Sequence, residues 1–142
     1  MRAEFTIPGA PQGKGRPRFS SYGGRVHTRT PEQTVLYENL VRTEYQRQCG
    51  DVRFPDGKAV NVEITAFYEI PKSAGKKKRQ EMLAGFRLRP TKKPDADNVA
   101  KVICDSLNGI AYRDDSQVAE LTVRKFYDEI PRVEVWISGE EA

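Results

Sequence analysis

The chain has 142 residues, a formal net charge of +4 at pH 7 and a hydrophobic content of 37%. This length and composition suit one globular domain, and no apolar run approaches the roughly 20 residues of a membrane span; the amino terminus carries no secretory signal, so we expect a cytoplasmic protein. With His27 as its only histidine, the chain is poorly supplied for zinc binding or histidine-based catalysis, and we expect Cys49 and Cys104 to be reduced, buried side chains.

The first third of the chain is predicted to contain a strand, a basic loop and a helix. Residues 3–7 suit a short strand, and the following stretch, GAPQGKGRPRFSSYGGRVHT, is rich in Gly, Pro and Arg without a period of 2 or 3.6, which is typical of an extended loop. A capping box from Thr30 to Gln33, with Pro31 at the first helical position, predicts a helix over about 31–48. Its expected buried stripe is Val35, Leu36, Leu40, Val41 and Tyr45.

The middle of the chain alternates and then becomes strongly basic. Residues 59–70 predict a strand with one buried face, which consists of Val60, Val62, Ile64, Ala66, Tyr68 and Ile70. From about Ser73 the lysine-rich sequence suits either a short basic helix or a loop.

The last third is predicted to hold an amphipathic helix and a hairpin. From Asp97 to Leu107, Asp97, Lys101 and Asp105 share one face, and the opposite, apolar face consists of Val99, Val102, Ile103 and Leu107. Residues 118–127 and 132–137 suit a hairpin with inward positions Ala119, Leu121, Val123, Val133, Val135 and Ile137. The order of elements predicts a single α+β domain over 1–142, a small mixed β-sheet with helices packed on one face.

Aspartates gather around the predicted second long helix. Asp95 and Asp97 lie at its start, and Asp114 and Asp115 precede the next strand. Carboxylates from these two places are able to hold a divalent cation, and an all-oxygen ligand set favours Mg²⁺ or Mn²⁺. Such a layout suits phosphodiester hydrolysis, with Lys101 available to stabilise developing charge.

The same residues also suit a structural role. Asp97 is able to cap the helix, Asp97 with Lys101 is an ordinary surface pair, and Asp114-Asp115 on its own would be a turn. Residue types alone leave both interpretations open.

The stretch KPDADNVAKVICDSLNGIAYRDDSQV resembles the signature of RusA-type Holliday-junction resolvases: D-x-D-N, a lysine four residues later, an L-N-G turn and then D-D-x-Q-V. The amino-terminal GKGRPRF resembles many phage and prophage members of that family. The resemblance implies a RusA-like fold and a homodimeric, Mg²⁺-dependent endonuclease that resolves four-way DNA junctions by paired symmetric nicks in recombination and repair. It implies that Asp95, Asp97 and Asp115 are the catalytic, metal-binding aspartates and Lys101 the catalytic lysine. It leaves open the role of Asp114, and whether Asp105 supports the site or is a solvated partner of Lys101.

Two basic blocks are candidates for DNA binding. Residues 1–31 contribute a charge of +5 and residues 72–93 contribute +8, whereas residues 94–142 contribute −6. This segregation suggests a polyanion that is held by the basic parts and presented to the acidic part. The expected phosphate contacts are Lys14, Arg16, Arg18, Lys76, Lys77 and Lys78.

Two other functions fit the sequence less fully. One is a general nuclease for branched DNA such as flaps and forks, and the other is a non-catalytic DNA-binding protein whose aspartates only cap helices. Hydrolysis of small phosphate esters fits poorly, because no glycine-rich phosphate loop is present and the basic regions are larger than a small substrate needs.

Overall fold

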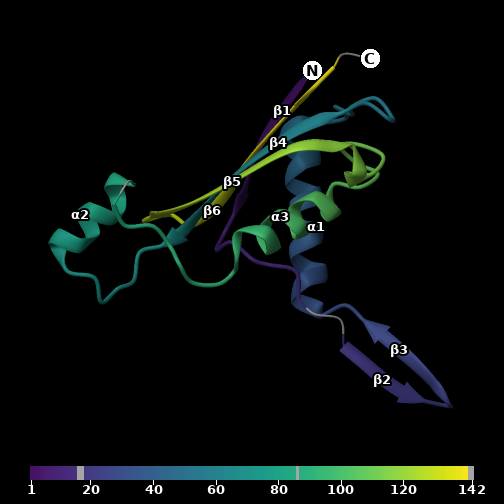
Figure 1. Cartoon of the computed structure of the whole chain (residues 1–142), viewed down its shortest axis with the longest axis horizontal. Helices are drawn as coiled ribbons and strands as arrows, with labels where there is room; N and C mark the ends of the chain where they lie inside the picture. The colour runs from purple at the N-terminus through teal and green to yellow at the C-terminus, as the bar shows by residue number, and fades with distance from the viewer. Residues whose placement is uncertain (16–17, 86, 141–142) are drawn as a thin grey trace.

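The computed structural model describes residues 1–15, 18–85 and 87–140. Its main sheet has four strands in the order β1-β6-β4-β5 (Figure 1). β1 and β4 both pair antiparallel with β6, and β4 pairs parallel with β5, so the sheet is mixed as predicted. The four strands are β1 (Arg2–Pro8), β4 (Val60–Glu69), β5 (Val118–Asp128) and β6 (Arg132–Gly139).

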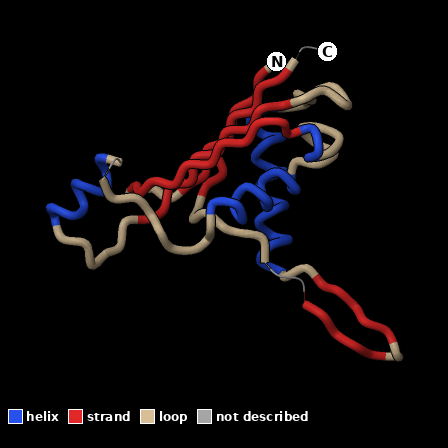
Figure 2. The backbone as a smooth tube through the Cα atoms, in the orientation of Figure 1, coloured by secondary structure: helices blue, strands red, loops and turns tan. Residues whose placement is uncertain are grey.

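Helices cover one face of this sheet and supply the core (Figure 2). α1 (Glu32–Cys49) packs on β1, and α3 (Ala96–Ser106) packs on α1 and β5. The predicted alternation of β4 is confirmed: its six predicted inward side chains, from Val60 to Ile70, are all buried. Phe5 and Tyr45 meet edge to face across the β1–α1 contact, with ring centroids 5.2 Å apart. Both cysteines are free, with Cys104 buried and Cys49 half-buried.

Helix α1 has the predicted length but a different start and a different buried face. Pro31, not Thr30, occupies the N-cap position, and no described side chain caps the helix. The buried residues are Thr34, Tyr37, Val41, Glu44 and Tyr45, while Val35 and Leu36 are exposed. The buried face differs from the predicted one because the Tyr37 ring packs into the core beside that of Tyr45, which turns Val35 and Leu36 toward solvent.

The predicted hairpin of residues 118–127 and 132–137 is wrong. β6 does not pair with β5; it lies between β1 and β4, and β4 separates it from β5. The chain from Asp128 to Arg132 passes over the end of β4, and the N–H of Ile70, directly after β4, donates to Asp128 O at 3.3 Å. β5 is therefore an edge strand, which leaves the predicted inward residues Ala119 and Leu121 exposed.

The predicted basic loop contains a second, separate sheet. β2 (Arg18–Tyr22) and β3 (Arg25–Arg29) form a hairpin that projects from the body near the start of α1 (Figure 1). Its turn is Gly23-Gly24, with φ of 61° and 75°, and a two-residue hairpin turn of this hand favours glycine at both positions.

The lysine-rich segment after β4 holds a helix, α2 (Lys76–Ala84), at the far end of β5. Among the described residues, no helix is long and apolar enough to cross a membrane.

Candidate active site

Helix α3 carries two of the predicted site residues on its solvent side. Its apolar face is buried at Val99, Val102 and Ile103, as predicted. Asp97 and Lys101 are exposed, and no ion pair joins them in the described part of the chain. The prediction that Asp97 and Lys101 form a surface ion pair is therefore not confirmed.

Asp95 occupies the N-cap position of α3, but its side chain forms no capping hydrogen bond. It follows the cis Lys93–Pro94 peptide, and the Tyr68 hydroxyl donates to the carbonyl oxygen of Pro94. Burial, together with the nearby Asp95 charge, raises the pKa of Tyr68 to about 12. Tyr68, from the end of β4, thus anchors the backbone that presents Asp95.

Asp105 and Asp115 meet from opposite ends of the loop that follows α3. Their carboxyl groups lie close enough for each to shift the pKa of the other. The Lys14 ammonium donates to Asp105 Oδ2 at 2.6 Å, so a residue from the amino-terminal basic segment completes the cluster. Asp105 is therefore partly shielded from solvent, and its ion-pair partner is Lys14 and not Lys101.

The two carboxyl groups have opposite pKa shifts. Burial on its own would raise the pKa of Asp105, but the hydrogen bonds from Lys14 and Asp115 outweigh it, and the pKa is lowered. The charge of Lys101 acts in the same direction. The pKa of Asp115 is raised by its hydrogen bond to Asp105 and by burial. Asp115 is therefore the residue of the pair that retains a proton more readily.

Glycines flank Lys14 because the backbone there passes between two helices. A Cβ on Gly13 would lie 2.2 Å from Asn98 Nδ2 in α3, and one on Gly15 would lie 2.8 Å from Thr34 Oγ1 in α1. The segment is tied to both helices, since Asn98 Nδ2 donates to Lys14 O at 3.2 Å and Gly15 N donates to Thr34 Oγ1 at 2.8 Å. These contacts hold the Lys14 side chain over Asp105.

The D-D-x-Q part of the motif divides into one site residue and two structural ones. A 3-10 helix, Asp115–Gln117, begins at Asp114, whose carboxylate accepts from Ser116 N at 3.0 Å. Gln117 Nε2 donates to Lys58 O at 2.9 Å and to Pro55 O at 3.0 Å, while its Oε1 accepts from Asp114 N at 3.3 Å. Asp114 is thus a cap, and Gln117 ties the Asp115 turn to the chain before β4.

The predicted metal ligands are not gathered into one group. Within the part of the chain that the structure describes, no three His, Cys, Asp or Glu side chains lie close enough together to hold a metal ion. Asp115 lies with Asp105, whereas Asp95 and Asp97 lie at the first turn of α3. The ligand set Asp95, Asp97 and Asp115 stays a prediction.

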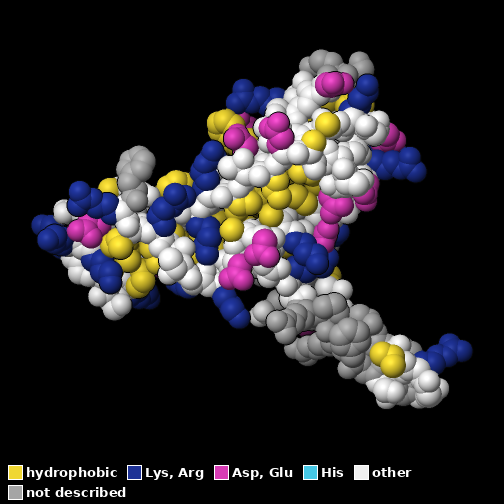
Figure 3. Space-filling model, viewed as in Figure 1, with side chains coloured by type: hydrophobic (Ala, Val, Ile, Leu, Met, Phe, Trp, Pro, Cys, Tyr) yellow, Lys and Arg dark blue, Asp and Glu magenta, His cyan; other side chains and the backbone are white. Residues whose placement is uncertain are grey.

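The predicted DNA-binding residues fall in different settings. Lys76, Lys77 and Lys78 are exposed on the first turn of α2, where basic side chains gather (Figure 3). Lys14 is engaged with Asp105 instead of being free for a phosphate. Arg16 and the side chain of Arg18 lie outside the described residues.

The sequence pattern of the endodeoxyribonuclease RusA family matches residues 8–138. The chain belongs to this family. It is also 39% identical over 135 residues to a Bacillus subtilis (strain 168) protein, YqaN, which is described as uncharacterized; the alignment covers 94% of each chain. The RusA match includes the Lys14 segment, α3 and the Asp115 turn, so the whole carboxylate site lies within the family's domain.

Sequence reasoning missed the connection of Lys14 to the carboxylates. The contact joins residues 91 positions apart, so no helical or strand period along the chain predicts it. The available signal was the Gly-Lys-Gly spacing, which indicates close backbone approach on both sides of the lysine.

Proposed function

We propose that this RusA-family chain is a Mg²⁺-dependent endodeoxyribonuclease that resolves four-way DNA junctions by paired symmetric hydrolysis of phosphodiester bonds. The observation that carries the proposal is the meeting of Asp105, Asp115 and Lys14 beside the polar face of α3, within a domain that matches the RusA pattern along its length. Asp95 and Asp97 at the start of α3, with Asp105 and Asp115 at its other end, give this side of the domain a negative charge that a cation would neutralise.

The residues present suit a hard divalent cation in their chemistry, because every candidate donor is a carboxylate oxygen. We assign Asp95, Asp97 and Asp115 as its ligands, with Mn²⁺ as a substitute for Mg²⁺. Such an ion would polarise a phosphate oxygen and activate a water molecule. The exposed Lys101 ammonium, one turn after Asp97, would stabilise the negative charge that develops on the phosphate.

A homodimer suits this substrate. A four-way junction presents two symmetry-related phosphates, and a two-fold dimer would supply one site for each. Sedimentation of the purified chain alone and with junction DNA tests this assembly, and a monomer under both conditions would contradict it.

The deciding experiment compares wild type with Asp97→Asn on labelled four-way junctions, flaps and linear duplexes in Mg²⁺. We expect paired symmetric nicks in the junction, and we expect Asp97→Asn to lower cleavage by at least about 100-fold while junction binding is kept. Glu120→Gln, at an exposed position outside the cluster, is the matched control and should cut as wild type does. Equal cutting of all three substrates would indicate a general branched-DNA nuclease. Tight binding without cutting by wild type would indicate a non-catalytic DNA-binding protein.

A further inference from the structure

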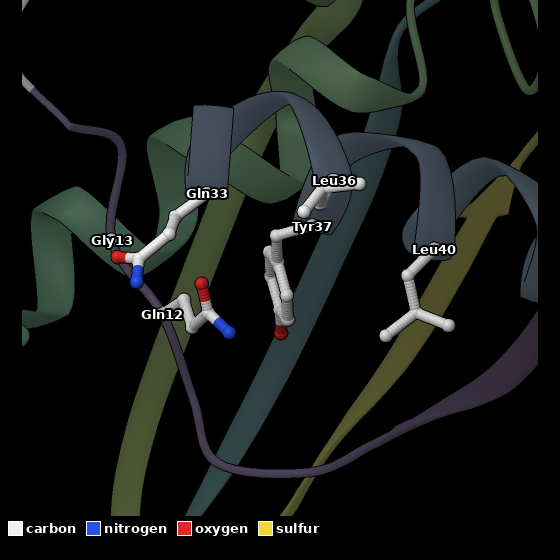
Figure 4. A pocket seen from close by; sticks show the side chains of 6 residues that line it. All are labelled: Gln12, Gly13, Gln33, Leu36, Tyr37 and Leu40. Atoms are coloured by element: carbon white, nitrogen blue, oxygen red, sulfur yellow. The ribbon is translucent and has the colours of Figure 1, made fainter. Parts of the chain in front are cut away.

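A pocket of about 470 Å³ lies between the segment that precedes Lys14 and the first two turns of α1 (Figure 4). Gln33 descends from α1 toward the segment, Gln12 extends from the segment toward the Tyr37 hydroxyl, and Leu40 lies farther along α1 (Figure 4). The lining consists of Gln12, Gly13, Gln33, Leu36, Tyr37 and Leu40.

Tyr37 is only 3% exposed, yet its hydroxyl has no hydrogen-bond partner among the residues that the structure describes. Burial raises the pKa of Tyr37, so the hydroxyl keeps its proton and remains both a donor and an acceptor. A buried polar group without a partner is rare, and it needs an explanation. A ligand in the pocket would supply the missing partner.

The chemistry of the lining selects an uncharged, flat group with hydrogen-bonding edges. None of the six lining residues carries a charge, so the pocket is unsuited to a phosphate. Gln12 and Gln33 are exposed and each offers one amide donor group and one carbonyl acceptor, the combination that pairs with the edge of a base. Leu36, Leu40 and the Tyr37 ring supply apolar surface for the faces of a heterocycle.

The pocket adjoins the candidate active site on two sides. Gly13 forms its wall and also packs against Asn98 and Pro94 at the start of α3. Tyr37 lies close enough to Tyr68 for ionisation of Tyr68 to raise the pKa of Tyr37, and Asp95 lies close enough to Tyr68 to raise the pKa of Tyr68. A group bound here would therefore lie next to the residues that are proposed to act on the phosphate.

We propose that this pocket takes up one unstacked nucleobase of the bound DNA, close to the phosphate that is cut, and that Gln12, Gln33 and Tyr37 read its edge. This inference rests on the proposed function and adds a specificity-determining subsite to it. Unstacking a base is least costly at a branch point, where stacking is already interrupted, so the pocket would favour junctions over continuous duplex.

Fluorescence of 2-aminopurine, which brightens when the base leaves the stack, tests the inference directly. Junctions with a single 2-aminopurine at each position that flanks the cut would be titrated with the Asp97→Asn chain, which is expected to bind without cutting. We expect a several-fold increase in fluorescence at one position, and no increase with a linear duplex.

Three substitutions in the same background separate recognition from folding. Gln33→Ala and Tyr37→Phe should each weaken junction binding by about fivefold to tenfold, the factor for one lost hydrogen bond, and reduce the fluorescence increase. Tyr37→Phe should leave the melting temperature unchanged or raise it, because the free protein loses an unpartnered hydroxyl. Gln46→Ala, an exposed glutamine farther along α1, is the control and should change neither quantity.

If the chain binds and cuts junctions, but no position brightens and the variants bind as wild type does, the pocket inference alone is overturned. If the wild-type chain does not bind junctions, the proposed function and the inference both fail. A loss of binding by Gln33→Ala that Gln46→Ala reproduces would also overturn the inference, because it would trace to the helix and not to the pocket.

Discussion

Two glycines decide where Lys14 lies. Gly13 and Gly15 have ordinary backbone angles, so their role is close approach: each fills a space in which a side chain would collide with Asn98 or Thr34. The lysine between them contacts Asp105, which is 91 positions away in the sequence. A single methyl group at either position is thus expected to disturb the site.

We predict that Gly13→Ala destabilises the fold and impairs cleavage. Its Cβ would displace the Asn98 side chain, which lies 2.2 Å away, and would break the hydrogen bond to Lys14 O. Loss of that bond costs about 1 kcal/mol of unfolding free energy. Urea unfolding measures the stability, and junction cleavage reports the displaced Lys14.

Gly75→Ala is the matched control for this substitution, because its Cβ would meet no atom within 4 Å and its backbone angle is ordinary. Equal stability and activity of the two variants would contradict a close approach at Gly13.

At the scale of elements, the turn before β5 shows how a structural residue serves the site. Gln117 bonds four backbone groups, two before β4 and two in the turn itself, at Arg113 and Asp114. These bonds hold the backbone that presents Asp115 to Asp105. Gln117 is a positioning residue, since it acts on the site through Asp115.

We predict that Gln117→Ala lowers the unfolding free energy by about 1 kcal/mol, because four backbone groups lose a partner and one of these hydrogen bonds is partly buried. It should also lower kcat more than it raises KM, since the substrate-binding surface is unchanged while Asp115 is less well positioned. Steady-state cleavage kinetics measure both constants. Gln80→Ala, at an exposed position on α2, should affect neither; a Gln117→Ala enzyme with normal kcat would show that the turn holds without this side chain.

The elements differ in how far sequence alone predicts them. α3 and β4 were predicted well because each has a strong hydrophobic period that packing obeys: 3.6 for the helix and 2 for the strand. The pairing of β6 was not predictable, because sequence neighbours usually pair, and only the assembled sheet reveals that β6 inserts between β1 and β4. Gly23-Gly24 favours the β2–β3 hairpin, but the flanking residues are rich in Arg and lack the alternation of apolar and polar residues that predicts strands.

The candidate site divides in the same way. Motif spacing placed Asp97 and Lys101 on the polar face of α3, since both belong to one helix. The meeting of Lys14, Asp105 and Asp115 depends on tertiary packing, and spacing along the chain does not encode it.

Across the whole molecule, exposed basic side chains gather on α2, apart from the carboxylates of α3 (Figures 1 and 3). The first turn of α2 holds three lysines and no acidic residue, although a helix amino terminus favours negative charge. A bound phosphate would offset this unfavourable arrangement.

Salt dependence of junction binding tests whether α2 lies on DNA. Each phosphate that a lysine neutralises contributes about 0.9 to the slope of log K against log salt concentration. If all three side chains contact duplex arms, Lys76→Gln, Lys77→Gln and Lys78→Gln combined should make the slope shallower by about 2 to 3. A control triple, Arg53→Gln, Lys58→Gln and Arg124→Gln, removes the same charge from side chains that already pair with Asp56, Glu140 and Glu63. Because counterion release counts phosphates in contact and not net charge, only the α2 triple should change the slope; equal changes in both would mean that α2 attracts DNA from a distance without touching it.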